Sequence, residues 1–127
     1  MTGMLSHKTL RRNVMLAACA VVGFVAPAAA SESRSQDLQT EIANLSDDAN
    51  NSDNAARNAE NAGDNAEACR LYRRAGDKWR EAASAGTTLI IETLNDGNLD
   101  PDAVNENVHI MANNAQVDDD RAEAVCK

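Results

Sequence analysis

The chain has 127 residues, of which 20 are acidic, 12 are Lys or Arg, and only three are aromatic. A chain of this length forms one domain at most. Its formal net charge of −8 argues against nucleic acid as a partner, because displacing counterions from a duplex requires clustered Lys and Arg.

Residues 1–30 have the three regions of a secretory signal peptide. Lys8, Arg11 and Arg12 precede an apolar stretch over residues 14–26, and alanines at 28–30 form a small-residue cleavage pattern. The apolar stretch is shorter than the roughly 20 residues that span a bilayer, which argues against a membrane anchor. We therefore expect cleavage near Ala30, a mature domain over residues 31–127 without a transmembrane segment, and a periplasmic or secreted location.

Two details leave the export route open. Cys19 follows Leu-Ala-Ala, as in the lipid-attachment box of bacterial lipoproteins, although the apolar stretch continues beyond it. The Arg11-Arg12 pair is found in twin-arginine signals, but Leu10 and Val14 depart from that motif. We expect the general secretory route. Cleavage at Ala30 would remove three basic residues and no acidic one, so the mature domain would be more acidic than the whole chain.

The first expected helix covers about residues 34–62 and ends at Gly63. Its small and apolar residues recur at alternating steps of four and three, which places them on one helix face. These residues are Leu38, Ile42, Leu45, Ala49, Ser52, Ala56 and Ala59.

The second expected helix covers about residues 64–95. Asp64 and Glu67 have the spacing of a capping box, in which each side chain accepts a hydrogen bond from a backbone amide of the other. Gly76 and Gly86 lie on the apolar face and indicate close helix approach, although a break near Gly86 would instead give four shorter helices. The same alternation continues through this helix, with Leu94 widening the face: Ala68, Tyr72, Ala75, Trp79, Ala82, Gly86, Leu89, Ile90 and Leu94.

The third expected helix covers about residues 101–126. Asp100 is suited to cap it, and Pro101 to occupy its first position, where an amide hydrogen is not needed. Its apolar face contains Val104, Val108, Met111, Ala115, Ala122 and Val125. Three helices of similar length with short connections predict an all-α fold, an antiparallel three-helix bundle.

Cys69 and Cys126 are the two cysteines of the mature domain, and we expect them to form an interhelical disulfide. Cys69 lies as far before Leu94 as Cys126 lies after Pro101, so an antiparallel hairpin brings the two to one level. The large apolar residues gather near the second turn, whereas the end near Gly63 is mostly alanine and buries little apolar area. The disulfide is therefore expected to stabilise the end of the bundle with the weaker core.

A basic run in the second helix is the most distinctive charged feature of this acidic chain. It contains Arg70, Arg73, Arg74, Lys78 and Arg80. An anion or an acidic partner is one interpretation. Acidic residues of the other two helices are expected opposite this run, which favours cross-helix salt bridges.

Asp96, Asn98, Asp100 and Asp102 alternate in the way that oxygen ligands do in calcium-binding hand loops. Pro101 replaces the glycine of that loop, and its twelfth position lacks the bidentate Glu, so a turn and a helix cap explain the same residues. Calcium binding by this loop is kept as the alternative function.

His109 has no partner that completes a transition-metal site or a catalytic group, and we expect no cofactor and no enzymatic activity.

Five residues at the first turn resemble part of a known family. Gly63, Asp64, Ala68, Tyr72 and Ala75 are spaced as in the second half of a tetratricopeptide hairpin. The resemblance occurs once and covers less than a quarter of the chain, whereas solenoids need about three repeats. It implies packing as a helical hairpin and a protein-binding role.

Together these features predict a non-enzymatic, exported interaction or structural module of the cell envelope or extracellular space. Leu71, Ile91 and Ile110 fall beside or off the main apolar faces and are the expected contacts with a partner. That partner is another envelope or extracellular protein, or a second copy of the chain. The alternative is that these residues only widen the core.

Overall fold

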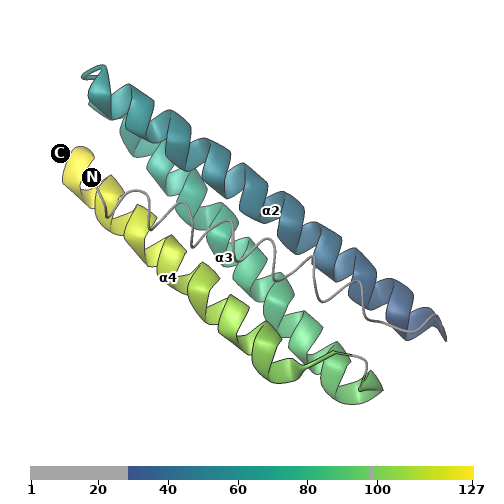
Figure 1. Cartoon of the computed structure of the whole chain (residues 1–127). Helices are drawn as coiled ribbons and strands as arrows, with labels where there is room; N and C mark the ends of the chain where they lie inside the picture. Colours follow the sequence, from purple (N-terminus) through teal and green to yellow (C-terminus); the bar gives the residue numbers. More distant parts are fainter. Residues whose placement is uncertain (1–28, 98) are drawn as a thin grey trace.

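A computed structural model of the chain describes residues 29–97 and 99–127 and confirms the three-helix fold. The helices are α2 (Ala29–Asn61), α3 (Asn65–Asp96) and α4 (Pro101–Val125), and those described residues contain no strand. Successive helices run in opposite directions, so α2 and α4 are parallel to each other (Figure 1). The first helix starts earlier than expected, and no Gly or Pro interrupts the chain between its two ends.

Each of the two inter-helix turns contains a glycine in the left-handed conformation. Gly63 and Gly97 have φ angles of 80° and 69°, in the left-handed region where a side chain is disfavoured. The Gly97 amide donates to the Thr93 carbonyl at 2.8 Å and closes the last turn of α3.

The N-caps of α3 and α4 are those that the sequence predicts, with one difference. Asp64 accepts a hydrogen bond from the Glu67 amide at 3.1 Å. The reciprocal half of the capping box does not form, because the Glu67 carboxylate binds Arg70 at 2.9 Å and the Asp64 amide donates to the Ala59 carbonyl. At the other turn, Asp100 accepts from the Asp102 amide at 3.0 Å.

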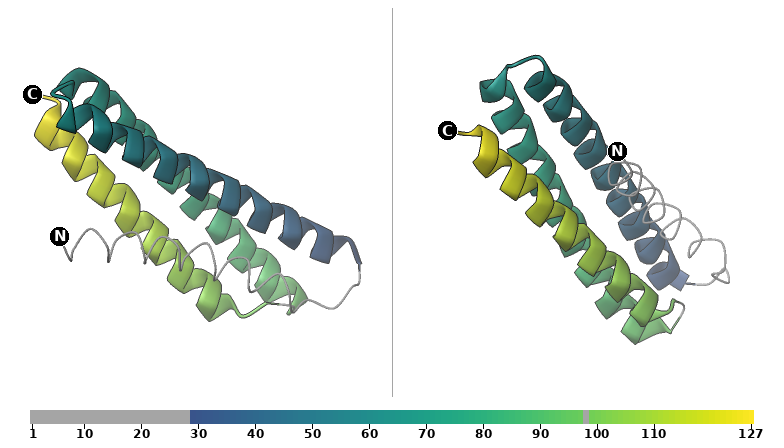
Figure 2. Two further views of the ribbon diagram at one scale, coloured as in Figure 1. Left: turned by 45° about the horizontal axis from the view of Figure 1, so that its top comes forward. Right: turned by 60° about the vertical axis from the view of Figure 1, so that its left-hand side comes forward.

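The middle helix α3 holds the molecule together. Both α2 and α4 pack along α3, whereas they contact each other at only a few points. Figure 2 shows the two outer helices on either side of α3. The core is therefore two interfaces that share one helix.

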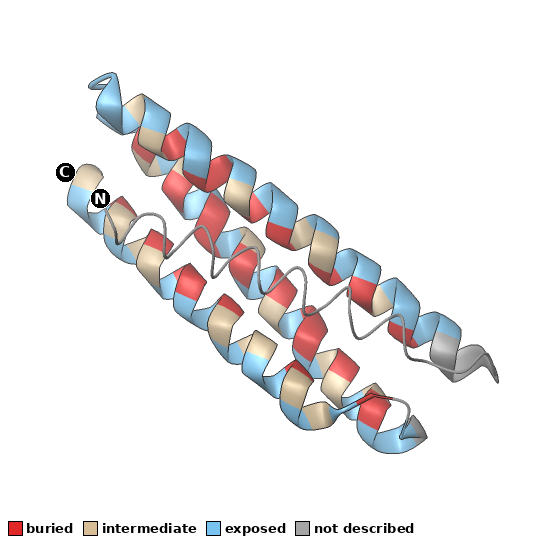
Figure 3. Ribbon diagram, viewed as in Figure 1, coloured by how far each residue is buried: buried red, intermediate tan, exposed pale blue. Residues whose placement is uncertain are grey.

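The core divides into two clusters, as the distribution of large residues predicts. The larger one lies toward the second turn and includes Trp79, Leu89 and Met111. The smaller one, near the first turn, consists of Tyr72 and three alanines. Burial runs in stripes along the facing sides of the helices (Figure 3).

The glycines of α3 allow close helix contact, and the expected alternative of a break near Gly86 is wrong because α3 is continuous. A Cβ atom at Gly86 would lie 2.6 Å from Cγ2 of Val108, and one at Gly76 would lie 2.5 Å from Oδ1 of Asp119. Both glycines therefore let α4 approach the α3 backbone.

The prediction that Leu94 belongs to the core is wrong. Leu94 is 67% exposed, whereas its neighbour Thr93 is buried. Thr93 continues the alternation of four and three that Leu89 belongs to, and its hydroxyl donates to the Ile90 carbonyl at 2.7 Å. Helix geometry thus places the smaller residue inside.

Candidate functional site

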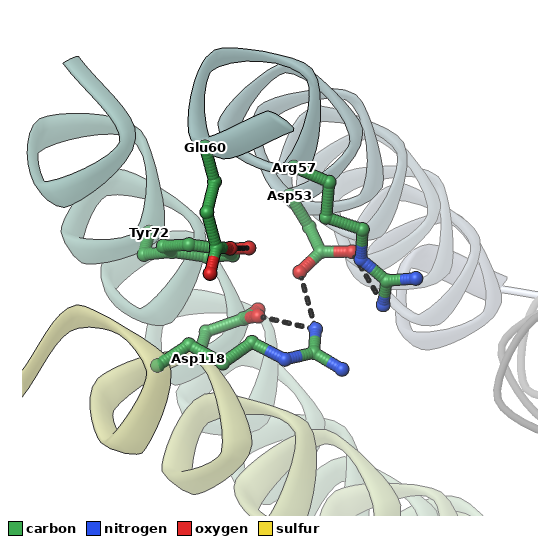
Figure 4. Close-up of polar contacts among 6 residues, drawn as sticks. Asp53, Arg57, Glu60, Tyr72 and Asp118 are labelled. Atoms are coloured by element: carbon green, nitrogen blue, oxygen red, sulfur yellow. Dashed lines mark hydrogen bonds and ion pairs between the residues drawn. The ribbon is translucent and has the colours of Figure 1, made fainter. Parts of the chain in front are cut away.

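A buried cluster of charged side chains joins the two outer helices. Asp53 of α2 is fully buried, forms an ion pair with Arg57 of the same helix at 3.1 Å, and accepts a hydrogen bond from Arg121 of α4 at 2.7 Å. Arg121 also lies 3.5 Å from Asp118, which is equally buried. Figure 4 shows the two carboxylates directed toward each other from opposite helices. The guanidinium groups compensate the buried negative charge, as burial of a carboxylate requires.

Tyr72 of α3 lies beside this cluster and completes it. Its hydroxyl donates to Glu60 of α2 at 2.6 Å, and the guanidinium of Arg121 lies 6.0 Å from its ring centre. Burial, together with the hydrogen bond to Glu60, raises the pKa of the Tyr72 phenol well above its usual range. The phenol therefore stays protonated and serves as a hydrogen-bond donor between helices.

The geometry of this cluster is suited to holding helices in register. The Asp53 carboxylate is already bound by two arginines, one from α2 and one from α4. Long side chains span a gap between α2 and α4 that the two backbones do not close. The cluster is thus a strap between the outer helices.

Further polar residues follow along the same side of the bundle. Because Asp53 and Arg121 are level on parallel helices, Ser46 and Asn114, each seven residues earlier, are level too. Both are buried, and neither the Ser46 hydroxyl nor the Asn114 side-chain nitrogen has a hydrogen-bond partner among the described residues. The side chains of Ser46 and Asn114 are shorter than that of Arg121, which reaches from α4 to α2.

The outer face of α3 carries the second candidate site, which we call the cationic hollow. It is an open depression of about 700 Å³ on the side of α3 away from the core. Its described lining comes entirely from α3 and consists of Ala66, Cys69, Arg70, Arg73, Arg74, Asp77, Lys78 and Glu81.

The ion pairs of the basic run differ from those expected. Only Arg80 makes a described cross-helix salt bridge, to Asp119 at 2.5 Å, and it also binds Asp77. Arg70 and Lys78 instead pair with acids of α3 itself, Glu67 and Glu81. The expectation of cross-helix pairing is therefore wrong for these two residues, because their side chains leave α3 on its outer side.

Arg73 and Arg74 make no salt bridge with any described residue, and both are exposed. The cross-helix role that the sequence suggested for the run belongs mainly to Arg121 of α4. The hollow is consequently positive at its centre, although the chain as a whole is strongly negative.

The expected disulfide forms between Cys69 and Cys126, whose Cα atoms are 5.1 Å apart. It links the start of α3 to the residue that follows α4, at the end of the bundle with the small core cluster. Cys69 also lines one edge of the cationic hollow. The disulfide therefore anchors that edge against α4.

The acidic loop is only partly within the described residues. The Asp100 carboxylate caps α4 through the Asp102 amide, while Asn98 and the side chain of Asp96 lie outside the description. Within the described part of the chain, no three His, Cys, Asp or Glu side chains are close enough together to hold a metal ion. Calcium binding at Asp96, Asn98, Asp100 and Asp102 remains a prediction.

The three residues expected to contact a partner have different environments. Leu71 and Ile110 are half-buried and pack against the core clusters, so they widen the core. Ile91 is 55% exposed and lies close in sequence to exposed Leu94. Among the three, only Ile91 offers substantial apolar surface to a partner.

Most of the expected signal peptide (residues 1–30), including Cys19 and the Arg11-Arg12 pair, falls on residues 1–28, which lie outside the description, whereas residues 29 and 30 are the first two residues of α2. Among the described helices, none is both long and apolar enough to cross a membrane.

Comparisons with protein-family models, curated protein sequences and solved structures yield no match to this chain.

Proposed function

We propose that this chain is an exported, non-enzymatic interaction module that binds another protein through the outer face of α3. The observation that carries the proposal is the cationic hollow. Residues of this face do not build the core, yet they form a depression whose central arginines have no described intramolecular salt bridge. A surface whose charged side chains do not contribute to the core, and whose charge opposes that of the whole chain, is a favourable place for a partner.

The rest of the molecule supports a rigid platform for this face. The disulfide fixes one end of α3 against α4, and the strap of Asp53 and Arg121 fixes α2 against α4. The binding surface is thus carried by a helix that is held on both sides. Export is proposed from the signal-peptide pattern, and a disulfide is typical of oxidising compartments outside the cytosol.

Site-specific photo-cross-linking in the producing cells tests the proposal. A photo-reactive phenylalanine analogue replaces Ala66, an exposed residue of the hollow whose side chain carries no charge. Matched probes replace Asn51 of α2 and Asn113 of α4, which are exposed on other faces. We expect a discrete cross-linked protein from position 66 alone. Equal capture from all three positions, or none from position 66, would contradict the proposed binding face.

A further inference from the structure

We propose that the cationic hollow binds an extended acidic segment of a partner polypeptide, with carboxylates on alternate residues placed over Arg70 and Arg74 and with Arg73 beside them. This inference rests on the proposed function and names the chemistry of the partner. The first argument is charge. Arg73 and Arg74 have no described salt bridge, and Arg70 has a side chain that is 59% exposed, so its guanidinium remains accessible beside Glu67.

The second argument is geometry. Arg70 and Arg74 are one step of four apart along α3, which is a rise of about 6 Å. In an extended peptide, side chains on the same side are about 6.6 Å apart. Two alternate acidic residues of such a segment therefore match the spacing of Arg70 and Arg74. Arginine is well suited to this role, because its planar guanidinium binds a carboxylate through two parallel hydrogen bonds.

The third argument concerns the choice between anions. Asp77 and Glu81 lie on the same face as the cations, and the whole chain has a formal charge of −8. A nucleic acid or an anionic membrane presents phosphates uniformly and would meet these acids together with the cations. A polypeptide can place its carboxylates at one end of the hollow and a neutral or basic residue at the other. The mixed lining of the hollow thus favours a polypeptide.

Fluorescence anisotropy with the oxidised protein tests this inference. The probe is a labelled short peptide in which Glu alternates with Ser, and the control peptide carries Gln in place of Glu. We expect the Glu peptide to bind at low salt and to bind less tightly as salt rises, because screening weakens exposed charge pairs. No binding of the Glu peptide, or equal binding of the Gln peptide, would overturn the inference.

Variants of the protein locate the binding. The combined change Arg73→Gln and Arg74→Gln should weaken binding of the Glu peptide by about tenfold or more. The matched control, Arg34→Gln with Lys127→Gln, removes the same charge from exposed positions outside the hollow and should change binding by less than about twofold. Equal effects of the two double variants would contradict the assigned site, as would tighter binding of a DNA duplex or of phosphatidylglycerol vesicles than of the peptide. Circular dichroism checks that each variant folds.

The cross-linking experiment separates the two proposals. Capture from position 66 that persists in the Arg73→Gln and Arg74→Gln background, with no binding of the Glu peptide, would leave the binding face in place and remove the acidic segment. Absence of capture from position 66 would remove the proposed function itself.

Discussion

Arg121 of α4 donates a hydrogen bond to Asp53 of α2 at 2.7 Å, and it is the one described ion pair that joins the two outer helices directly. Asp53 is fully buried, whereas the Arg121 side chain is 27% exposed. In this pair the accepting carboxylate of Asp53 is shielded from solvent, whereas the donating side chain of Arg121 is partly exposed. This asymmetry makes its contribution to stability testable.

We expect Arg121→Ala to lower the free energy of unfolding by about 2 kcal/mol. The substitution leaves Asp53 with Arg57 alone and removes a described partner of Asp118, and a buried carboxylate that loses its partner is strongly destabilising. Solvent around Arg121 reduces the effect. Urea unfolding measures it against Arg34→Ala, which breaks an exposed pair with Glu92 and should change stability by less than about 1 kcal/mol. Similar losses in both variants would show that the strap adds nothing specific.

The single tyrosine of the chain provides a prediction about alkaline pH. Burial and the hydrogen bond to Glu60 raise the pKa of Tyr72 in the folded protein, whereas in the unfolded chain a tyrosine ionises near pH 10. The stability associated with the protonated phenol is therefore fully present below about pH 10 and is lost as the pH rises toward the folded pKa. Absorbance at 295 nm should show phenolate forming only together with unfolding.

Two variants serve as controls for the tyrosine titration. Tyr72→Phe should abolish the absorbance change and make stability less dependent on pH in the alkaline range. Glu60→Gln keeps the ring buried but removes the charged acceptor, so the pKa of Tyr72 should move back toward its ordinary value. A folded protein that titrates near pH 10 would contradict the environment described for Tyr72.

The two interior glycines of α3 should respond differently to alanine. Gly→Ala in a helix gains about 1 kcal/mol in propensity. At Gly86 the new methyl group would meet Val108, whose branched side chain is stiff, so we expect a net destabilisation of about 1–2 kcal/mol. At Gly76 it would meet the end of the Asp119 side chain, which can rotate away, and stability should stay within about 1 kcal/mol of wild type. Urea unfolding of both variants tests this order, and a larger loss at Gly76 would contradict it.

Reduction of Cys69–Cys126 should lower the free energy of unfolding by about 2–4 kcal/mol, because the bond closes a long loop of 57 residues. The loss should appear first near Gly63, where the core cluster consists of Tyr72 and alanines. Hydrogen exchange followed by mass spectrometry, with and without reductant, gives the location. Uniform loss of protection along all three helices would contradict this prediction.

Much of the fold follows from local rules that the sequence displays. The alternation of apolar residues, the caps at Asp64 and Asp100, and the equal spacing of the two cysteines from the second turn predict the helices, their order and the disulfide. Each of these depends on neighbours in the chain or on a simple rise per residue. They require no knowledge of how the outer helices are placed.

The burial of Asp53 and Asp118 does not follow from hydropathy, because charged residues are mostly exposed. Asp118 occupies the step between Ala115 and Ala122 in the apolar alternation of α4, so a carboxylate in a core position was the available signal. The pairing of Arg121 with Asp53 depends on the distance between α2 and α4, which no local sequence rule gives. In the same way, hydropathy favours Leu94 over Thr93 as the core residue, although the helical period places Thr93 inside.

The position of the disulfide gives the two turns different consequences if a protease cleaves them. Loop tips are common sites of proteolytic cleavage. A cut at Gly97 would leave α4 tied to α3 through Cys69–Cys126, so the polypeptide would remain a single covalent assembly. A cut at Gly63 would leave α2 with no covalent link to the other helices. Cleavage at Gly97 therefore leaves all three helices covalently linked, whereas cleavage at Gly63 allows α2 to dissociate.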